Sequence, residues 1–385
     1  MDTGKLNKIL DITAMNHDDQ ASNDRVGIDG RREKKELPIL DCLMPSGFTR
    51  RLLLTGGLVI ASSKALGWRS EVGSLINVQD FGATGDGVTD DTKAIREAHS
   101  HGSPVRYPRP RKFYKVTQSV TVISDVRGEN SEIRYVQDGS DAGVVYRIGP
   151  QVQGVTISGM TIDGGYVGGN SGEFSHGISV EGASKVTIRG NTIRRVYGDC
   201  VYVGSSQAKV ASRNITIVDN QLENPRRCNI AVVCGSNVRI ERNTMKKMTD
   251  YVSAIDVEPN DNGFDFARDI EVLNNHFDAE GIFIYLTSAS TKLTTKLTGV
   301  SIRGNVGSAK TFLKVTSPAR ADALVLMDNT FVSKSVMGGM FVLDGVNRAR
   351  ISGNRDNSHC WVGLYRSHRI RTTTYTSYGN SFCNG

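Results

Sequence analysis

The chain has 385 residues, enough for one large domain or two of ordinary size. It contains 41 glycines but only 9 prolines, and asparagine recurs throughout, which favours a turn-rich β architecture over a helical one. The net charge of +7 fits either a solvated basic surface or the attraction of an acidic polymer. The sequence contains no basic helix and no Lys/Arg run interleaved with aromatic residues, which argues against nucleic acid.

The N-terminal part of the chain is predicted to be a targeting segment rather than a folded domain. Residues 1–43 are polar and charged, and we expect them to be disordered or an over-extended start, with translation beginning at Met44. In residues 44–65, the pair Arg50-Arg51 precedes an apolar run too short to span a bilayer, and a small-residue cleavage site follows. This segment resembles a twin-arginine export signal, so we predict a periplasmic or secreted protein.

A dense acidic loop, FGATGDGVTDDT, occupies residues 81–92. Such a loop could cradle a metal ion, but it lies before the first repeat of the chain. We interpret Gly85-Asp86-Gly87 as a tight turn and Thr89 or Asp90 as the N-cap of the helix that follows. The predicted role of the loop is therefore structural.

Internal repeats predict the fold. Short segments that alternate apolar and polar residues each end in an asparagine at a turn, and an eighth copy carries Met160 at that position. Stacked asparagines can adopt left-handed backbone geometry and hydrogen-bond to the next repeat. The repeated asparagines are Asn191, Asn220, Asn243, Asn275, Asn305, Asn329 and Asn354.

A second series of short strands lies between these segments, and its inward apolar residues recur about every 27 residues. Two short strands per repeat with no helix between them describe a parallel β-solenoid, whereas a propeller blade needs four strands in about 40 residues. We predict an all-β, single-stranded parallel β-helix over residues 76–357, with an N-terminal capping helix and a C-terminal cap or tail at 358–385.

The alternation also predicts which side chains of the second series face outward. One outward column reads Ser179, Tyr202, Ala231, Asp256, Phe283, Lys314 and Val342. The next reads Glu181, Gly204, Val233, Glu258, Tyr285, Thr316 and Asp344. His176 and Asp199 stand at strand starts, and Arg227 precedes Cys228. Aromatic side chains stack on sugars, cations hold uronates and paired acids transfer protons, so this surface suits a carbohydrate.

Three carboxylates are the candidate catalytic residues. Asp256 and Glu258 stand two apart on one strand face, which predicts a separation of roughly 6–7 Å. Asp199 lies two repeats away from Asp256, which predicts roughly 9–10 Å. Both distances are near the roughly 6.5–9.5 Å separation of inverting glycosidases.

The cysteines fit an exported protein only loosely. Cys42 precedes the predicted mature chain, which leaves an odd number and at least one free thiol. The predicted disulfide is Cys360–Cys383, and neither a CxxC motif nor a Cys/His spacing indicates zinc.

The stretch INVQDFGATGDGVTDDTKAIREAH, residues 76–99, resembles the start of the pectin-lyase-like superfamily of right-handed parallel β-helix proteins, which includes polygalacturonase-like hydrolases, tailspike depolymerases and pectate lyase superfamily proteins. Residues 226–260 resemble a recurring segment whose IDVEPN strand carries two acids. Polygalacturonase motifs are incomplete, because Asp199 is the single acid in GDC, His176-Gly177 precedes it and no Arg-x-Lys follows. The calcium and arginine motifs of pectate lyases are not evident.

The first functional hypothesis is a glycoside hydrolase acting on an acidic polysaccharide. Glu258 or Asp199 would be the general acid, and Asp256 would be the base that activates water. The expected substrate-binding residues are Arg227, Tyr202, Tyr285, Phe283, Lys314, Glu181 and His176.

Two alternatives remain open at this point. A polysaccharide lyase would use Lys314, Arg227, His176 or Tyr202 as base, with Ca²⁺ held by Asp256 and Glu258; otherwise no cofactor is expected. A non-catalytic polysaccharide-binding or surface β-helix would bind without cleaving. In each case we expect a polysaccharide partner, no nucleic acid, no membrane span, and a monomer or, by analogy with tailspikes, a homotrimer.

Overall fold

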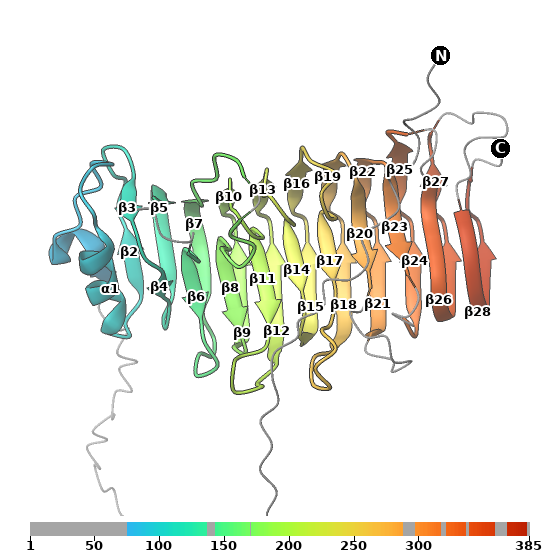
Figure 1. Cartoon of the computed structure of the whole chain (residues 1–385), viewed down its shortest axis with the longest axis horizontal. Helices are drawn as coiled ribbons and strands as arrows, with labels where there is room; N and C mark the ends of the chain where they lie inside the picture. Colours follow the sequence, from blue (N-terminus) through green and yellow to red (C-terminus); the bar gives the residue numbers. More distant parts are fainter. Residues whose placement is uncertain are drawn as a thin grey trace, which may run out of the picture. The chain divides into compact units, whose positions relative to one another are not determined.

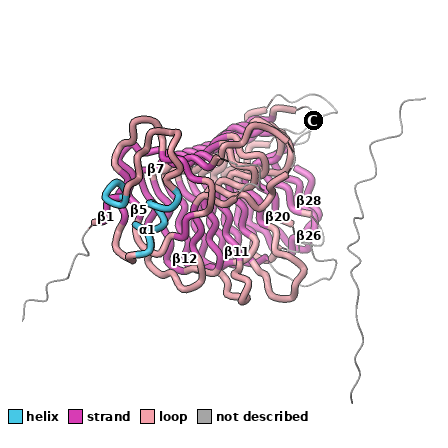
Figure 2. Tube along the Cα trace, turned by 60° about the vertical axis from the view of Figure 1, so that its left-hand side comes forward, coloured by secondary structure: helices cyan, strands magenta, loops and turns pink. Residues whose placement is uncertain are grey.

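A computed structural model describes residues 75–136, 143–169, 171–287, 297–316, 321–335, 339–358 and 368–382. Within these ranges, short parallel strands stack turn upon turn into one β-solenoid, as Figures 1 and 2 show. No helix in the described ranges is long and apolar enough to cross a membrane. The predictions for residues 1–74 and for the Cys360–Cys383 disulfide lie outside the described residues.

Each central turn of the solenoid, here called a coil, contributes three strands rather than the two predicted. The strands after the asparagine turn form a third series because the alternation resumes there for three or four residues. The first series, named the site face, comprises β4 (Val120–Thr121), β6 (Tyr146–Ile148), β8 (Ile178–Glu181), β11 (Val201–Gly204), β14 (Ile230–Val232), β17 (Ile255–Val257), β20 (Ile282–Leu286) and β23 (Thr311–Val315).

The second series, named the back face, comprises β9 (Ser184–Arg189), β12 (Ser212–Val218), β15 (Gly235–Glu241), β18 (Ala267–Leu273), β21 (Leu297–Arg303) and β24 (Leu324–Met327). The third series comprises β10 (Thr192–Arg194), β13 (Gln221–Glu223), β16 (Thr244–Lys247), β19 (His276–Ala279), β22 (Val306–Ala309), β25 (Thr330–Ser333) and β27 (Arg355–Asp356). The long strands β7 (Thr156–Asp163) and β26 (Gly339–Ser352) each pair with strands of more than one series, and β5 (Val126–Tyr135) pairs with β7.

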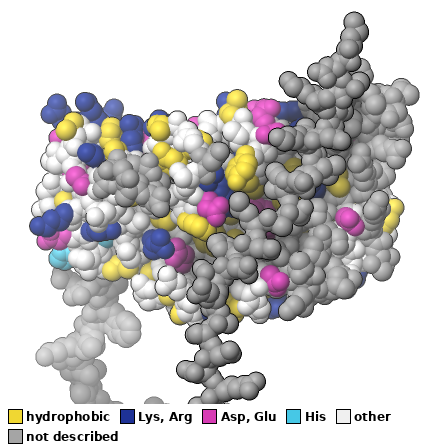
Figure 3. All heavy atoms as spheres, viewed as in Figure 1, with side chains coloured by type: hydrophobic (Ala, Val, Ile, Leu, Met, Phe, Trp, Pro, Cys, Tyr) yellow, Lys and Arg dark blue, Asp and Glu magenta, His cyan; other side chains and the backbone are white. Residues whose placement is uncertain are grey.

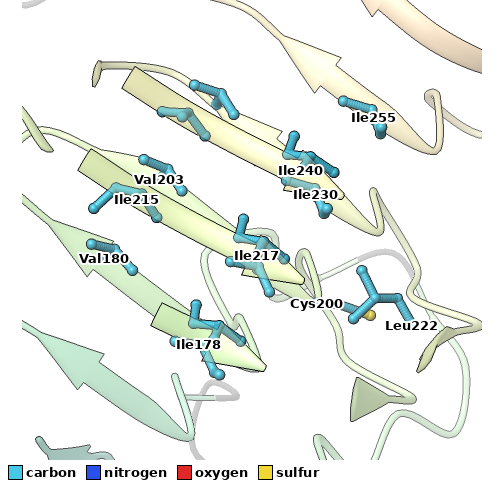
Figure 4. Close-up of a cluster of buried hydrophobic side chains, with 14 of the residues drawn as sticks. Ile178, Val180, Cys200, Val203, Ile215, Ile217, Leu222, Ile230, Ile240 and Ile255 are labelled. Atoms are coloured by element: carbon cyan, nitrogen blue, oxygen red, sulfur yellow. The ribbon is translucent and has the colours of Figure 1, made fainter. Parts of the chain in front are cut away.

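A continuous core fills the coils because alternate residues of all three series point inward. Figure 4 shows part of it, where Val180 and Val203 of the site face lie in one cluster with Ile215 and Ile217 of the back face. Each of these four side chains is completely buried. The predicted class, an all-β parallel β-helix, is confirmed.

The predicted asparagine ladder is present inside the turn between the second and third series. At the centre of the ladder, Asn275 Nδ2 donates to Asn305 Oδ1 and to the Ile240 carbonyl, and Asn275 Oδ1 accepts from the Asn243 backbone. The sequence predicted left-handed backbone at the asparagines themselves, but it lies one residue before each of them. The left-handed residues include Gly190, Asp219, Arg242, Asn274, Gly304, Asp328 and Gly353.

The two ends of the solenoid extend the repeat pattern. At one end, the Met160 backbone N–H donates to Asn191 Oδ1, so Met160 occupies the ladder position without contributing a side-chain rung. At the other end, β28 (His368–Tyr378) pairs in parallel with β26, and Asn380 adds a rung beyond Asn354. The solenoid therefore continues past residue 357, into the segment predicted as a cap or tail.

The acidic loop connects η1 (Val78–Phe81) to the helix α1 (Thr92–Ser100), which lies at the N-terminal end of the solenoid with β1 (Ile76–Asn77), β2 (Val105–Tyr107) and β3 (Tyr114–Val116) (Figure 1). Asp86 accepts from the Val88 and Thr89 backbones, and Asp91 accepts from Thr84 and Gly85. Asp90 accepts from the backbone N–H of Thr92, the first helical residue. The three carboxylates are therefore used to organise the turn, in agreement with a structural role.

A buried histidine in α1 predicts acid sensitivity of the fold. His99 is 2% exposed, and its Nε2 lies 2.9 Å from the Tyr107 hydroxyl. Burial lowers the pKa of His99 to about 4, from an ordinary value of 6.5. The unfolded chain therefore takes up a proton as the pH falls below 6.5, whereas the folded chain does so only near 4. The stabilisation is complete above pH 6.5 and is lost as the pH falls through this window.

We expect the free energy of unfolding to fall by up to about 3 kcal/mol between pH 7 and 4 because of His99. Urea unfolding at pH 7 and 4.5 measures this change in the free energy of unfolding. In His99→Gln the free energy of unfolding should differ less between the two pH values. The exposed His101→Gln is the matched control and should leave it unchanged. An equal pH dependence in His99→Gln and the parent chain would contradict the assignment.

Candidate functional site

A pair of carboxyl groups occupies the middle of the site face. Asp256 lies in β17, and Glu258 follows the end of that strand. Asp256 is 3% exposed, whereas Glu258 is half-buried. The two side chains interact directly, and each shifts the pKa of the other.

Burial is the main reason that Asp256 holds a proton. It raises the pKa of Asp256 to about 8, and the nearby Glu258 and Asp199 charges act in the same direction, against Arg227. Asp256 Oδ1 has no hydrogen-bond partner among the described residues. Burial also raises the pKa of Glu258, but Arg227 and the hydrogen bond from Asp256 oppose the shift. Asp256 is therefore protonated near neutral pH, a state that suits a proton donor better than the base that was predicted.

Asp199 is an anchor in this site rather than an acid. It is 1% exposed; its Oδ1 accepts from the Cys228 backbone at 3.0 Å, and its Oδ2 lies 3.2 Å from His176 Nδ1. Burial alone would raise the pKa of Asp199, but His176, Arg227 and the Cys228 N–H bring it below the ordinary value. A buried and ionised Asp199 does not fit the predicted alternative of a general acid.

His176 is buried beside Asp199. It is 4% exposed, and its ring contacts Asp199 rather than pointing outward into solvent. A Cβ on Gly198 would stand 2.7 Å from His176 Nδ1. The glycine before Asp199 is therefore required for the close approach of the two coils. In this structure His176 contacts Asp199 and the Tyr202 ring, so it positions other residues of the site, whereas it was predicted to bind substrate.

Two cations compensate for the carboxylates. Arg227 Nε lies 3.8 Å from Asp199, and its Nη1 lies 3.7 Å from Glu173, a residue that sequence reasoning missed. Burial tends to lower the pKa of Arg227, but the carboxylates raise it above its ordinary value, so Arg227 stays charged. Lys247, also missed, is 1% exposed, and burial lowers its pKa to about 8. The alternation of β16, in which Met245 and Lys247 both point inward, was the available signal.

Two tyrosines flank the carboxyl pair. The Tyr202 ring stacks on His176 with 4.6 Å between ring centroids, and it lies over Gly204, where a Cβ would be 2.4 Å from the ring. Tyr285 is the direct neighbour of Asp256 in the next coil, not of Glu258 as predicted, because β20 pairs two residues further along than expected. Lys314 follows Tyr285, with its Nζ 5.4 Å from the ring centroid.

Phe283 does not belong to this surface, which corrects its prediction as a substrate-binding residue. It is completely buried, and its ring stacks on Phe277 at 3.7 Å between centroids. The register of β20 gives Tyr285 the place expected for Phe283. The alternation also breaks here, because Phe283 and Ile284 are both buried, and the Phe283 ring packs against Phe277 and Phe312.

The far end of the same surface is held by an ion pair. Glu181 Oε2 accepts from Arg147 at 2.7 Å, and Glu181 also accepts from Ser179. Arg147 was missed because the repeat was counted from residue 176 onward, although β6 pairs with β8 in the same register. The outward residues that align across the coils, named the site column, are Arg147, Ser179, Tyr202, Ala231, Asp256, Tyr285 and Lys314.

The residues of the site do not fit a calcium ion. Within the part of the chain that the structure describes, no three His, Cys, Asp or Glu side chains are grouped to bind a metal. Arg227 carries its charge close enough to lower the pKa of both Asp256 and Glu258, so it would oppose a cation there. The Ca²⁺ considered for a lyase is therefore not supported by this donor set.

Figure 3 shows charges of both signs interspersed on one face of the molecule, with basic side chains most frequent over the N-terminal coils.

Comparison with known proteins extends this picture. A family model described as the right handed beta helix region matches residues 124–355, and one described as rhamnogalacturonase A/epimerase, pectate lyase-like, matches residues 75–122. A search of curated protein sequences finds no match.

Similar solved structures share little sequence with this chain. An N-terminal fragment of bacteriophage phi29 gene product 12 is 16% identical with a TM-score of 0.65, and the match covers 79% of this chain and 57% of that one. The Streptococcus pneumoniae surface adhesin PfbA is 14% identical, with a TM-score of 0.56 and coverage of 80% and 98%. The A-module of the Azotobacter vinelandii mannuronan C-5 epimerase AlgE6 is 14% identical, with a TM-score of 0.52 and coverage of 80% and 98%.

These structural likenesses concern the fold, and this chain spans little more than half of the phage fragment. The family model covers more than half of the chain, and together with the strand register it identifies the architecture. The chain belongs to the right-handed β-helix proteins of the pectin-lyase-like superfamily.

Proposed function

We propose that this protein hydrolyses glycosidic bonds in a uronate-containing polysaccharide. The observation that carries the proposal is Asp256, a carboxyl group that is 3% exposed, lacks a partner at Oδ1 and has a pKa of about 8. A buried carboxyl group without full hydrogen bonding destabilises the fold, and such groups are concentrated at sites of proton transfer.

The proposed reaction uses the two carboxyl groups in different protonation states. When substrate displaces Glu258 from its hydrogen bond, Asp256 donates its proton to the glycosidic oxygen as the C–O bond breaks. Glu258, whose pKa is raised by burial and lowered in part by Arg227, accepts a proton in its ionised form from the water whose oxygen bonds to the anomeric carbon. After the products leave, the proton returns from Glu258 to Asp256 through their shared hydrogen bond.

The neighbours of Asp256 suit a sugar chain that runs across the coils. Coils stack about 4.8 Å apart, so Tyr285 and Lys314 stand roughly one and two coils from Asp256. The Tyr285 ring offers a stacking surface, and Lys314 and Arg227 offer charges to a uronate carboxylate. Tyr202 and the Arg147–Glu181 pair would contact the opposite end of the chain of sugars.

The twin-arginine-like segment supports a location outside the cytoplasm, where such a polysaccharide would be met.

The product distinguishes the three functional classes. Acidic exopolysaccharides and pectins are incubated with the protein, and reducing ends and unsaturated uronides are both followed. Hydrolysis gives reducing ends without ultraviolet absorbance, whereas a lyase gives both. Binding without either product would show a non-catalytic protein and reject the proposal.

The pH dependence then tests which residue is the acid. Asp256 must be protonated to act, so we expect kcat/KM to fall as the pH rises through about 8. In Asp256→Glu, the alkaline limb of the pH profile of the residual kcat/KM should move to another pH or disappear. An alkaline limb that is unchanged in this variant would contradict the role of Asp256.

A further inference from the structure

A second candidate binding site lies on the back face, on strands β12, β15, β18 and β21. It is a depression of about 510 Å³, with lining residues that include Asn214, Asn237, Arg239, Asp269, Glu271 and Ser301. None of these residues belongs to the site column. The depression is built by two parallel columns, one with left-handed backbone at Asn214, Asn237 and Asp269, and one in the strands at Arg239, Glu271 and Ser301.

A glycine opens one end of the depression. Gly299 occupies the left-handed position next to Asp269, and a Cβ there would stand 2.5 Å from Asp269 Oδ1. The missing side chain leaves a hollow at this point of the column. The depression crosses four coils, which corresponds to a length of roughly 14 Å.

The lining presents hydrogen-bonding groups that are already held in place. Asn237 Nδ2 donates to Asn214 Oδ1 at 3.0 Å, which leaves the other half of each amide for a ligand. Arg239 is fixed between Glu241 at 2.7 Å and Glu271 at 2.8 Å. Side chains ordered before binding lose less entropy when a ligand arrives.

The charge of the lining selects the kind of ligand. It includes one cation, Arg239, and two carboxylates, Asp269 and Glu271. Arg239 is already neutralised by its carboxylate partners, so the depression does not favour an anion. Amides, hydroxyls and carboxylates repeated at the coil spacing match a ligand whose hydroxyl groups repeat along a chain.

We infer that the back-face depression binds a short neutral segment of a polysaccharide, separately from the site column. The inference rests on the proposed function only in naming a polysaccharide as the ligand. A polysaccharide bound at both faces would stay attached to the protein during cleavage. The contacts would be hydrogen bonds from sugar hydroxyls to Asn214, Asn237, Asp269 and Ser301.

The test uses the full chain carrying Asp256→Asn, so that no polymer is consumed. Its mobility is measured in native gels that contain a neutral β-glucan, galactomannan or arabinan, with polygalacturonate as the acidic comparison. We expect at least one neutral polymer to retard the protein. Adding Asn214→Ala and Asn237→Ala should weaken that retardation roughly tenfold, because hydrogen bonds are lost at two exposed positions.

Lys185→Ala is the matched control, because Lys185 has the same left-handed position one coil outside the depression and is exposed. It should leave the retardation unchanged. If no neutral polymer retards the chain, or if the Asn214/Asn237 variant binds as well as its parent, the inference is wrong. Retardation that depends on these asparagines, in a protein that cleaves nothing, would keep the second site and reject the proposed hydrolysis.

Discussion

Replacing Asp256 with asparagine is expected to make the protein more stable while it abolishes activity. At pH 8 the free energy of unfolding should rise by roughly 2–5 kcal/mol, since the variant no longer buries an ionisable group. The rate kcat should fall by about 10²–10⁴, because asparagine cannot donate the proton. Chemical unfolding and reducing-end assays on the same preparation measure both effects.

The sign of the stability change follows from the pKa of Asp256. In the unfolded chain this carboxyl group ionises near its ordinary value of 3.8, whereas in the folded protein it holds its proton until about 8. The unfolded state therefore binds fewer protons than the folded state between these values. Stability falls as the pH rises through the window, and the gain in Asp256→Asn should grow in parallel.

The exposed Asp80→Asn is a matched control for the loss of one negative charge, and it should change neither quantity. A variant that loses activity but also loses stability would show that Asp256 is a structural residue. A variant that gains stability and keeps full turnover would remove Asp256 from the mechanism.

Replacing Asn275 with leucine should have the largest destabilising effect. Asn275 is completely buried in the ladder, where it donates to Asn305 and to the Ile240 carbonyl and accepts from the Asn243 backbone. The variant leaves these partners buried without hydrogen bonds, each at a cost of about 1–3 kcal/mol. We expect the free energy of unfolding to fall by roughly 3–5 kcal/mol, measured by chemical unfolding.

Asn380→Leu provides the comparison, because Asn380 is the last described rung and is only half-buried. Water can satisfy its partners, so the expected loss is about 1 kcal/mol. If the free energy of unfolding falls by the same amount in both variants, burial does not determine how much each asparagine of the ladder contributes to stability. If Asn275→Leu unfolds during purification, Asn275→Ser keeps a neutral hydroxyl that can donate and accept, and allows a smaller, measurable loss.

The carboxyl pair could be predicted from the sequence, but its chemistry could not. Alternation alone places Asp256 and Glu258 on one outward face. Their protonation depends on how much solvent reaches them and on Asp199 and Arg227, which come from two other coils. No local pattern carries that information, and the proposed roles of Asp256 and Glu258 therefore differ from those predicted from the sequence.

The register of β20 shows a different limit. Period-two alternation predicts the same inward and outward faces whether Ile255 pairs with Ile282 or with Ile284. A slip of two residues is thus invisible in the pattern, although a slip of one would expose the core. In the structure Ile255 pairs with Ile284, and this register places Tyr285 beside Asp256. In the same strand, the Phe283 ring packs against Phe277.

The sequence by itself determined the repeat, the asparagine ladder, the parallel β-solenoid and the surface that carries the acidic residues. Those features follow from side-chain alternation and from turn residues, which act over a few neighbouring positions. Only the tertiary structure decided which carboxyl group holds a proton, which aromatic ring stands beside it and that the back face is hollowed. These properties arise where side chains from successive coils meet, because burial and charge are summed over all neighbours in space.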